Sequence, residues 1–174
     1  AFQLDDRVSQ YLPEFAETPV WKGGDIENTE EQSTPMLVRH LMTHTSGLTY
    51  GFMQSNLLDE SYRKERLEFQ GDHETLEEAV KRLARVPLMC QPGSQWNYSV
   101  STDVLGRLVE VWSGLTLEEF MEKEIFDPLQ MADTGFSVSE QNIERFSALY
   151  SPLHGSGGMS SIGAASDENS LARS

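Results

Sequence analysis

The chain has 174 residues, and its 13 basic and 28 acidic side chains give a formal net charge of −15. This length accommodates one domain or a piece of a larger protein, and the negative surface would repel both a nucleic-acid backbone and an anionic membrane, so we expect neither partner. No run approaches the roughly 20 apolar residues of a membrane-spanning helix, and the N-terminus lacks the basic start and apolar middle of a signal peptide, which slightly favours a cytoplasmic location without defining the compartment.

The first part of the chain predicts two short helices separated by a loop. Apolar side chains recur with helical spacing over residues 4–12, and the proline that follows would end this helix. Residues 16–34 combine proline and glycine with an acidic run, which predicts a surface loop. Thr34 followed by proline is typical of an N-cap for a helix at about 35–45, and Gly47 lies where a left-handed C-cap is favourable.

The middle of the chain carries the clearest helical signals. Residues 53–74 are rich in charge and lack a firm apolar period, which predicts a solvated helix or loop. Thr75 and Glu78 form a capping box that opens a helix ending before the next proline. Apolar residues then recur with helical spacing over 104–112, and Gly114 occupies the C-cap position of that helix.

The C-terminal part contains one further helix and a tail. Thr116 and Glu119 form a second capping box, for a helix that must end before Pro128. No segment alternates strictly between apolar and polar residues for long, so we expect a mainly α fold with little sheet. We expect residues 1–154 to form one helical subdomain and the Gly- and Ser-rich residues 155–174 a flexible tail.

Four segments share the order and spacing of one enzyme family: Leu-Asp-Asp-Arg-Val at 4–8 with Tyr-Leu-Pro at 11–13, Val-Arg-His-Leu-Met-Thr-His-Thr-Ser-Gly-Leu at 38–48, Pro-Gly-Ser-Gln-Trp-Asn-Tyr-Ser at 92–99, and Phe-Asp-Pro-Leu-Gln-Met at 126–131 with Asp-Thr at 133–134. Residues 1 to about 135 thereby resemble the serine β-lactamases and penicillin-recognising hydrolases of the class C branch, and most of all the β-lactamase-related carboxylesterases. The resemblance implies the helical subdomain of the β-lactamase-like α/β fold, without most of its sheet subdomain.

The resemblance also implies an acyl-transfer chemistry. In that family the serine of a Ser-x-x-Lys box attacks an ester or lactam carbonyl, a tyrosine shuttles the proton, and a third box lines the oxyanion hole. Only the tyrosine has a match here, and that match is Tyr98. A free phenol has a pKa of about 10 and becomes a base near neutral pH only beside cations, which the other two boxes supply.

We therefore expect a middle fragment of such an enzyme, catalytically inactive by itself. The family places its Ser-x-x-Lys box before the first of the four segments and its third box at a position that would follow Ser174. We expect no cofactor and no metal ion, and the full-length parent would act on a small-molecule ester or lactam. The lactamase branch has asparagine two residues after the tyrosine, where this chain has Val100, so we expect ester hydrolysis to exceed lactam hydrolysis.

Other residues imitate functional motifs. Ser61 and Lys64 form a literal Ser-x-x-Lys, but solvated charges surround them, which favours an exposed helical face over a catalytic pair. His40 and His44 have a spacing that could share zinc, yet no third ligand is evident, so structural histidines are the better interpretation. Cys90 has no basic neighbour and no second cysteine to pair with, which favours a small buried apolar side chain.

A second hypothesis remains open beside the enzymatic one. The chain could be a helical binding or interaction module descended from this family, without chemistry of its own. If the chain is a fragment, a helical subdomain separated from its sheet would expose an apolar face, so we expect self-association through that face as a dimer or higher oligomer, or else marginal stability.

Overall fold

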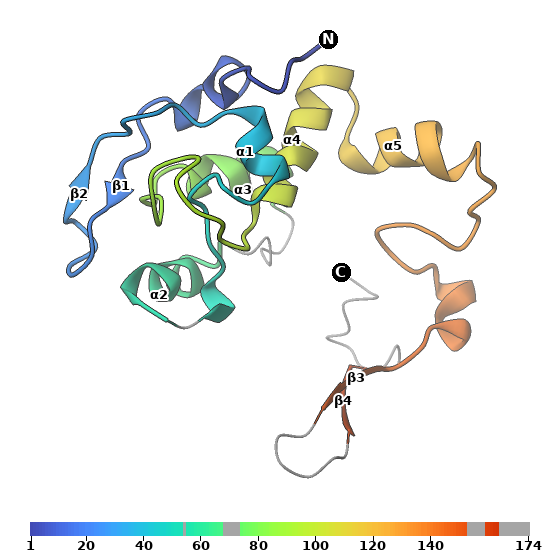
Figure 1. Cartoon of the computed structure of the whole chain (residues 1–174). Coiled ribbons are helices and arrows are strands. Elements are labelled where there is room, and N and C mark those ends of the chain that lie inside the picture. The colour runs from blue at the N-terminus through green and yellow to red at the C-terminus, as the bar shows by residue number, and fades with distance from the viewer. Residues whose placement is uncertain (54, 68–73, 153–158, 164–174) are drawn as a thin grey trace. The chain divides into compact units, whose positions relative to one another are not determined.

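Helices carry most of the regular structure in this computed structural model, which describes residues 1–53, 55–67, 74–152 and 159–163 (Figure 1). This confirms the expectation of a mainly α fold. The chain divides into two compact units, Ala1–Leu117 (unit 1) and Glu118–Ser174 (unit 2). Within the described ranges, none of the helices combines the length and apolar character that crossing a bilayer requires.

The N-terminal segment forms two short 3₁₀ turns, η1 (Val8–Gln10) and η2 (Pro13–Phe15), and the prediction of one helix over 4–12 is wrong. The Val8 amide donates to Met36 O at 2.9 Å, and the Val38 amide donates to Asp6 O at 3.0 Å. These long-range bonds pair the backbone around residue 7 with that around residue 37, so a helix cannot begin before Val8. Pro13 starts η2 because its missing N–H is tolerated at the first helical position.

A small hairpin replaces part of the predicted loop at 16–34. Strands β1 (Val20–Trp21) and β2 (Thr29–Glu30) pair antiparallel, with Val20 opposite Glu30. The Trp21 amide also donates to Leu88 O, and the Leu88 amide donates to Pro19 O, both at 2.8 Å. Strands of two residues are too short to produce an alternating pattern, so tertiary pairing decides this structure.

Helix α1 (Val38–Met42) is shorter than predicted, and Thr34 does not cap it. Instead Leu37 has extended backbone, and the His40 imidazole accepts a hydrogen bond from the Leu37 amide, with Nδ1 at 3.2 Å. Gly47 has the expected left-handed backbone, with φ +89°, but it lies beyond the helix end at Thr43.

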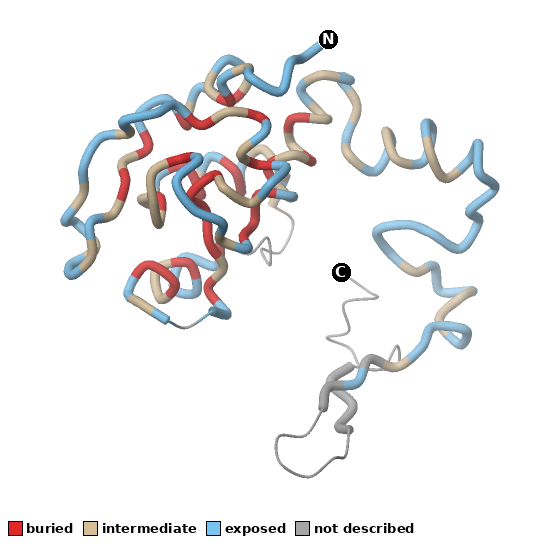
Figure 2. The backbone as a smooth tube through the Cα atoms, viewed as in Figure 1, coloured by how far each residue is buried: buried red, intermediate tan, exposed pale blue. Residues whose placement is uncertain are grey.

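The core of unit 1 forms around α1, α3 (Leu76–Leu83) and α4 (Ser101–Ser113), and α2 (Leu57–Lys64) packs beside it (Figure 2). The predicted capping box is confirmed: Glu78 Oε2 accepts from the Thr75 amide at 2.9 Å, and Thr75 Oγ1 accepts from the Glu78 amide at 3.2 Å. Gly114, with φ +73°, ends α4 as predicted. Fully buried core side chains include Val8, Leu12, Phe15, Val38, Leu41, Leu58, Tyr62, Val80, Leu83, Val104 and Leu108.

Unit 2 begins with α5 (Leu117–Met121, whose first residue belongs to unit 1) and continues into a π-helical segment, η4 (Glu122–Phe126). A 3₁₀ segment, η5 (Glu140–Arg145), follows, and β3 (Leu149–Pro152) pairs antiparallel with β4 (Met159–Gly163). The predicted boundary at 154/155 lies outside the described residues, as does most of the predicted tail. No residue of unit 2 whose side chain is described is fully buried.

Candidate active site

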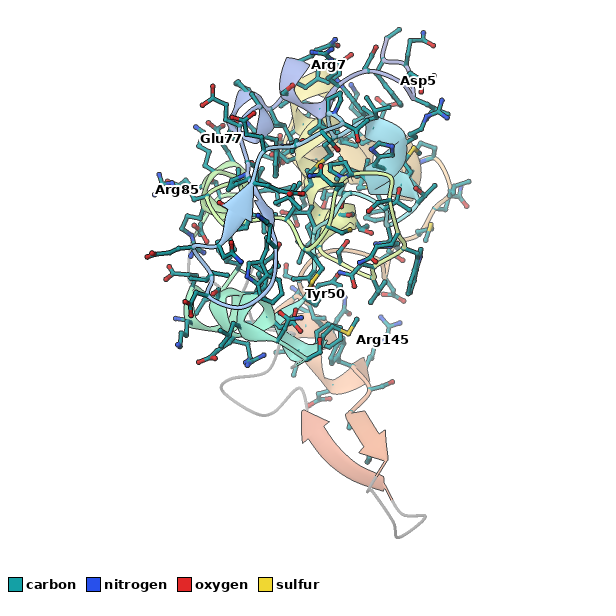
Figure 3. All side chains as sticks on the ribbon, turned by 60° about the vertical axis from the view of Figure 1, so that its left-hand side comes forward. Asp5, Arg7, Tyr50, Glu77, Arg85 and Arg145 are labelled. Carbon is teal, nitrogen blue, oxygen red and sulfur yellow. The ribbon has the colours of Figure 1, made fainter. Side chains whose placement is uncertain are left out.

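Tyr98 lies in the segment that leads into α4, within an aromatic cluster of unit 1. Its ring centroid is 4.9 Å from that of His44, 5.2 Å from Tyr50 and 6.4 Å from Trp96. Tyr50, labelled in Figure 3, comes from the segment between α1 and α2, so the cluster joins parts of the chain about 50 residues apart. Tyr98 is 43% exposed, and its hydroxyl makes no hydrogen bond to any group in the described part of the protein. The phenol is therefore held by ring packing while its oxygen stays available.

Backbone hydrogen bonds join the segment before Tyr98 to the one that follows α1. The Asn97 amide donates to His44 O at 2.8 Å, and the Gly93 amide donates to Thr45 O at 2.7 Å. The Asn97 side chain adds a bond from Nδ2 to Leu48 O at 2.7 Å. Two of the segments that carried the family resemblance thus lie side by side and together hold Tyr98.

Gly47 allows this close approach. A Cβ built on Gly47 would lie 2.4 Å from Cys90 O and 3.0 Å from Leu88 Cβ. The Gly47 carbonyl also accepts from the Met89 amide at 2.6 Å. Cys90 is half-buried, and its carbonyl rather than its thiol makes the contact with Gly47. Only glycine fits here, because both the backbone conformation and the neighbouring chain exclude a side chain.

Three buried serines extend from the core to the aromatic cluster. Ser46, Ser99 and Ser101 are each 0% exposed. The oxygens of Ser46 and Ser101 are 2.7 Å apart, and those of Ser101 and Ser99 are 2.8 Å apart. Ser99 Oγ then lies 3.3 Å from Nδ1 of His44. The sequence did not reveal this serine chain, because 55 positions separate Ser46 from Ser101 and no local spacing signals their contact.

The Ser-x-x-Lys at Ser61 and Lys64 is not built as a catalytic pair. Ser61 Oγ donates to Leu57 O at 3.1 Å within its own helix. Lys64 has a side chain that is 71% exposed, and its Nζ pairs with Glu60 at 2.8 Å. This hydrogen bond from Lys64 lowers the pKa of the Glu60 carboxyl. The exposed ammonium lacks the burial that a catalytic lysine needs, as the sequence indicated.

The two histidines of the Val38–Leu48 segment make different contacts. His40 completes the first turn of α1 through Nδ1, and burial lowers its pKa. His44 contacts Ser99 and Tyr98 instead. Across the described residues, no three His, Cys, Asp or Glu side chains gather as metal ligands would.

Val100, the position that differs from the lactamase branch, is 0% exposed and belongs to the core of unit 1. Its amide donates to Thr49 O at 3.4 Å. The side chain thus contributes to the core of unit 1 and carries no hydrogen-bonding group for a ligand.

Comparison with known proteins identifies the family. The family model described as "Beta-lactamase" matches residues 1–167, so the chain belongs to the β-lactamase family. The relatives include a lovastatin esterase of Penicillium rubens, 35% identical over 136 residues that make up 76% of this chain and 33% of the relative. Esterase EstB of Burkholderia gladioli is 35% identical over 150 residues, 84% of this chain and 35% of its own.

A solved structure agrees with these relatives. EstCE1, described as a hydrolase with promiscuous acyltransferase activity, superposes with a TM-score of 0.70 at 29% identity, over 93% of this chain and 39% of EstCE1. The chain spans about a third of the length of the curated relatives it matches. The resemblance to the esterase relatives is therefore confirmed, and the chain aligns with one part of those proteins.

Proposed function

We propose that the protein containing this chain is a serine carboxylesterase or acyltransferase, and that Tyr98 is its proton-transfer residue. The observation that carries the proposal is the placement of Tyr98: a half-exposed phenol, fixed by ring contacts, whose hydroxyl has no partner in the described part of the chain. Relatives named as esterases support an ester as the substrate class.

The proposed reaction requires Tyr98 to accept a proton from the nucleophilic serine and then to donate it to the leaving alcohol. When the nucleophilic serine attacks the ester carbonyl, its hydroxyl proton passes to the phenolate oxygen of Tyr98 as the Oγ–C bond forms. When the tetrahedral intermediate breaks down, the same proton goes to the leaving alcohol oxygen, and the acyl-enzyme remains. Water or an acceptor alcohol then repeats the cycle and releases the acyl group.

We propose further that the 174-residue polypeptide is inactive by itself. Its sequence contains one Ser-x-x-Lys string, Ser61 to Lys64, and the exposure and ion pair of that lysine argue against catalysis there. A purified polypeptide of these residues should leave p-nitrophenyl acetate intact. Saturable turnover that Ser61→Ala abolishes would contradict this proposal.

A preference for esters over lactams is also part of the proposal. Val100 is completely buried, and its side chain offers no hydrogen bond to the amide side chain of a β-lactam. The full-length protein should therefore cleave short-chain p-nitrophenyl esters faster than a chromogenic cephalosporin. The reverse order of rates would contradict the ester preference while leaving the role of Tyr98 open to its own test.

The test of Tyr98 is Tyr98→Phe in the full-length protein. Removing the hydroxyl should lower kcat for p-nitrophenyl acetate by about 10² to 10⁴, the usual contribution of a general acid–base group. The matched control is Tyr11→Phe, which removes a phenol hydroxyl that donates to Asp6 at 2.6 Å beside the opposite end of α4. A Tyr98→Phe enzyme as active as the Tyr11→Phe enzyme would refute the assignment.

The second candidate is a non-catalytic binding module that self-associates. It is favoured by the exposure of large apolar side chains on unit 1, namely Met42 at 54%, Phe52 at 53%, Leu57 at 48% and Trp96 at 67%. Sedimentation of the purified polypeptide should then show a dimer or higher oligomer. A monomer at micromolar concentration would exclude self-association, and ester turnover by the full-length protein would exclude a purely non-catalytic role.

A further inference from the structure

The hydrogen-bonded series of three buried serines that leads to His44 begins at a backbone amide. The Leu48 amide donates to Ser46 Oγ at 3.2 Å, and a backbone N–H can only donate. From there the contacts run through Ser101 and Ser99 to Nδ1 of His44. The three hydroxyls are fully buried, so each of their protons needs an acceptor within the chain.

Counting protons decides how the imidazole of His44 is protonated. The three serine hydroxyls bring three protons, and three contacts are available: Ser46 to Ser101, Ser101 to Ser99, and Ser99 to His44. If Nδ1 accepts, each contact holds one proton and every hydroxyl is satisfied. If Nδ1 carries a proton, it fills the last contact, and one buried hydroxyl loses its acceptor at a cost of about 1–3 kcal/mol.

We propose that the serine chain holds His44 as the neutral tautomer protonated on Nε2, and that His44 is the positioning residue for Tyr98. This inference rests on the proposed function of Tyr98. The imidazole ring packs against the Tyr98 ring at a centroid distance of 4.9 Å, with the planes inclined by 53°. Its Nε2 has no hydrogen-bond partner within the described residues.

The backbone of His44 is fixed where α1 ends. His44 has φ +53°, in the left-handed region that residues other than glycine seldom adopt. The His44 amide donates to Leu41 O at 3.3 Å and the Thr45 amide donates to His40 O at 2.8 Å, which is the usual hydrogen-bond pair at a helix C-terminus. The Asn97 amide donates to His44 O at 2.8 Å. The backbone of His44 is thereby joined both to α1 and to the segment that carries Tyr98.

The first test reads the tautomer directly and needs no activity. In the full-length protein with ¹⁵N-labelled histidine, the long-range ¹H–¹⁵N coupling pattern of His44 at neutral pH should show a proton on Nε2 and none on Nδ1. Ser99→Ala removes the hydroxyl that donates to Nδ1, so the two nitrogen shifts should move toward the average of freely exchanging imidazole. Ser61→Ala is the control, because Ser61 does not belong to the series of three buried serines, and it should leave the nitrogen shifts of His44 unchanged.

A proton on Nδ1 of His44 in the unmodified protein would overturn the proposal, whether or not any variant folds. So would a His44 spectrum that Ser99→Ala does not alter.

The second test asks whether the tautomer matters for Tyr98. Ser99→Ala and His44→Asn should each lower kcat about 10- to 100-fold with little change in KM, because a displaced proton-transfer group slows chemistry more than binding. Asparagine tolerates the left-handed backbone and still offers an oxygen to Ser99, so His44→Asn removes the ring alone. Unchanged kcat in both variants would refute the positioning role.

The two proposals can fail separately. If Tyr98→Phe retains full activity while His44 is protonated on Nε2 only, the proton-transfer role of Tyr98 is wrong and the tautomer assignment stands. If Tyr98→Phe is inactive while His44 carries a proton on Nδ1, the assignment of the serine chain is wrong and the role of Tyr98 stands.

Discussion

Gly47, at its close contact with Leu88 and Cys90, provides a quantitative test of the packing. Gly47→Ala places a methyl group 2.4 Å from Cys90 O and 3.0 Å from Leu88 Cβ. Backbone bonds from the Met89 amide to Gly47 O and from the Trp21 amide to Leu88 O hold the two residues directly before Cys90 in place. The backbone must therefore shift, in a region that carries Ser46 and borders the Tyr98 cluster.

Two contributions to the loss of unfolding free energy add in Gly47→Ala. Alanine at φ +89° is strained by roughly 1–2 kcal/mol relative to glycine. Displacing packed neighbours adds about 1–3 kcal/mol. The expected loss of about 2–5 kcal/mol is a large fraction of the roughly 5–15 kcal/mol that stabilises a typical protein. Urea unfolding of the full-length protein, followed by circular dichroism, measures it as a lower midpoint at unchanged slope.

Gly24→Ala separates the two costs. Gly24 also has positive φ, at +74°, but a Cβ built on it would meet nothing within 4 Å. This variant should lose only the backbone strain of about 1–2 kcal/mol. Equal losses at Gly47 and Gly24 would show that the contact with Cys90 is not a constraint, and the reasoning about the closely packed segments would be refuted.

Two further predictions concern stability. The buried Asp59 carboxylate accepts from the Ser55 amide at 2.9 Å and the Ser55 hydroxyl at 2.6 Å, so Asp59→Asn should cost about 1–3 kcal/mol in urea unfolding, whereas the exposed Asp25→Asn should stay within about 0.5 kcal/mol. Hydrogen bonds from the Thr75 amide and hydroxyl lower the pKa of Glu78 below 4.5, so its stabilising effect is complete above pH 4.5 and disappears as pH falls through the lowered value. Glu78→Ala should therefore differ from the parent at pH 7 and converge with it in acid, and a difference independent of pH would contradict the capping argument.

The parts of the fold that the sequence predicted are those held by contacts within one or two turns. The capping box joins Thr75 to Glu78, three residues apart, and Gly114 ends α4 through its own left-handed backbone. Such interactions need no distant partner, so spacing alone reveals them. Pro13 shows the limit of this reasoning: proline was expected to end one helix over 4–12, yet it begins η2 after the separate 3₁₀ turn η1. Backbone bonds to Met36 and Val38 hold the residues around Arg7 outside any helix.

In the candidate site, too, the sequence indicated some features and only the structure showed the others. The Trp-Asn-Tyr-Ser string indicated Tyr98, and Val100 was recognised as a departure from the lactamase pattern, both from residue identity. The sequence did not reveal that His44 packs on Tyr98, since 54 positions separate them. Nor did it reveal that Val100 belongs to the core.

By itself, then, the amino-acid sequence determined the helical class and the family, because helix periodicity, capping spacing and motif order are local properties of a chain. Only the tertiary structure decided which loops touch, why Gly47 must be glycine and how three buried hydroxyls connect to an imidazole. Those features depend on burial, which removes water as an alternative partner and leaves each polar group to find one across the fold.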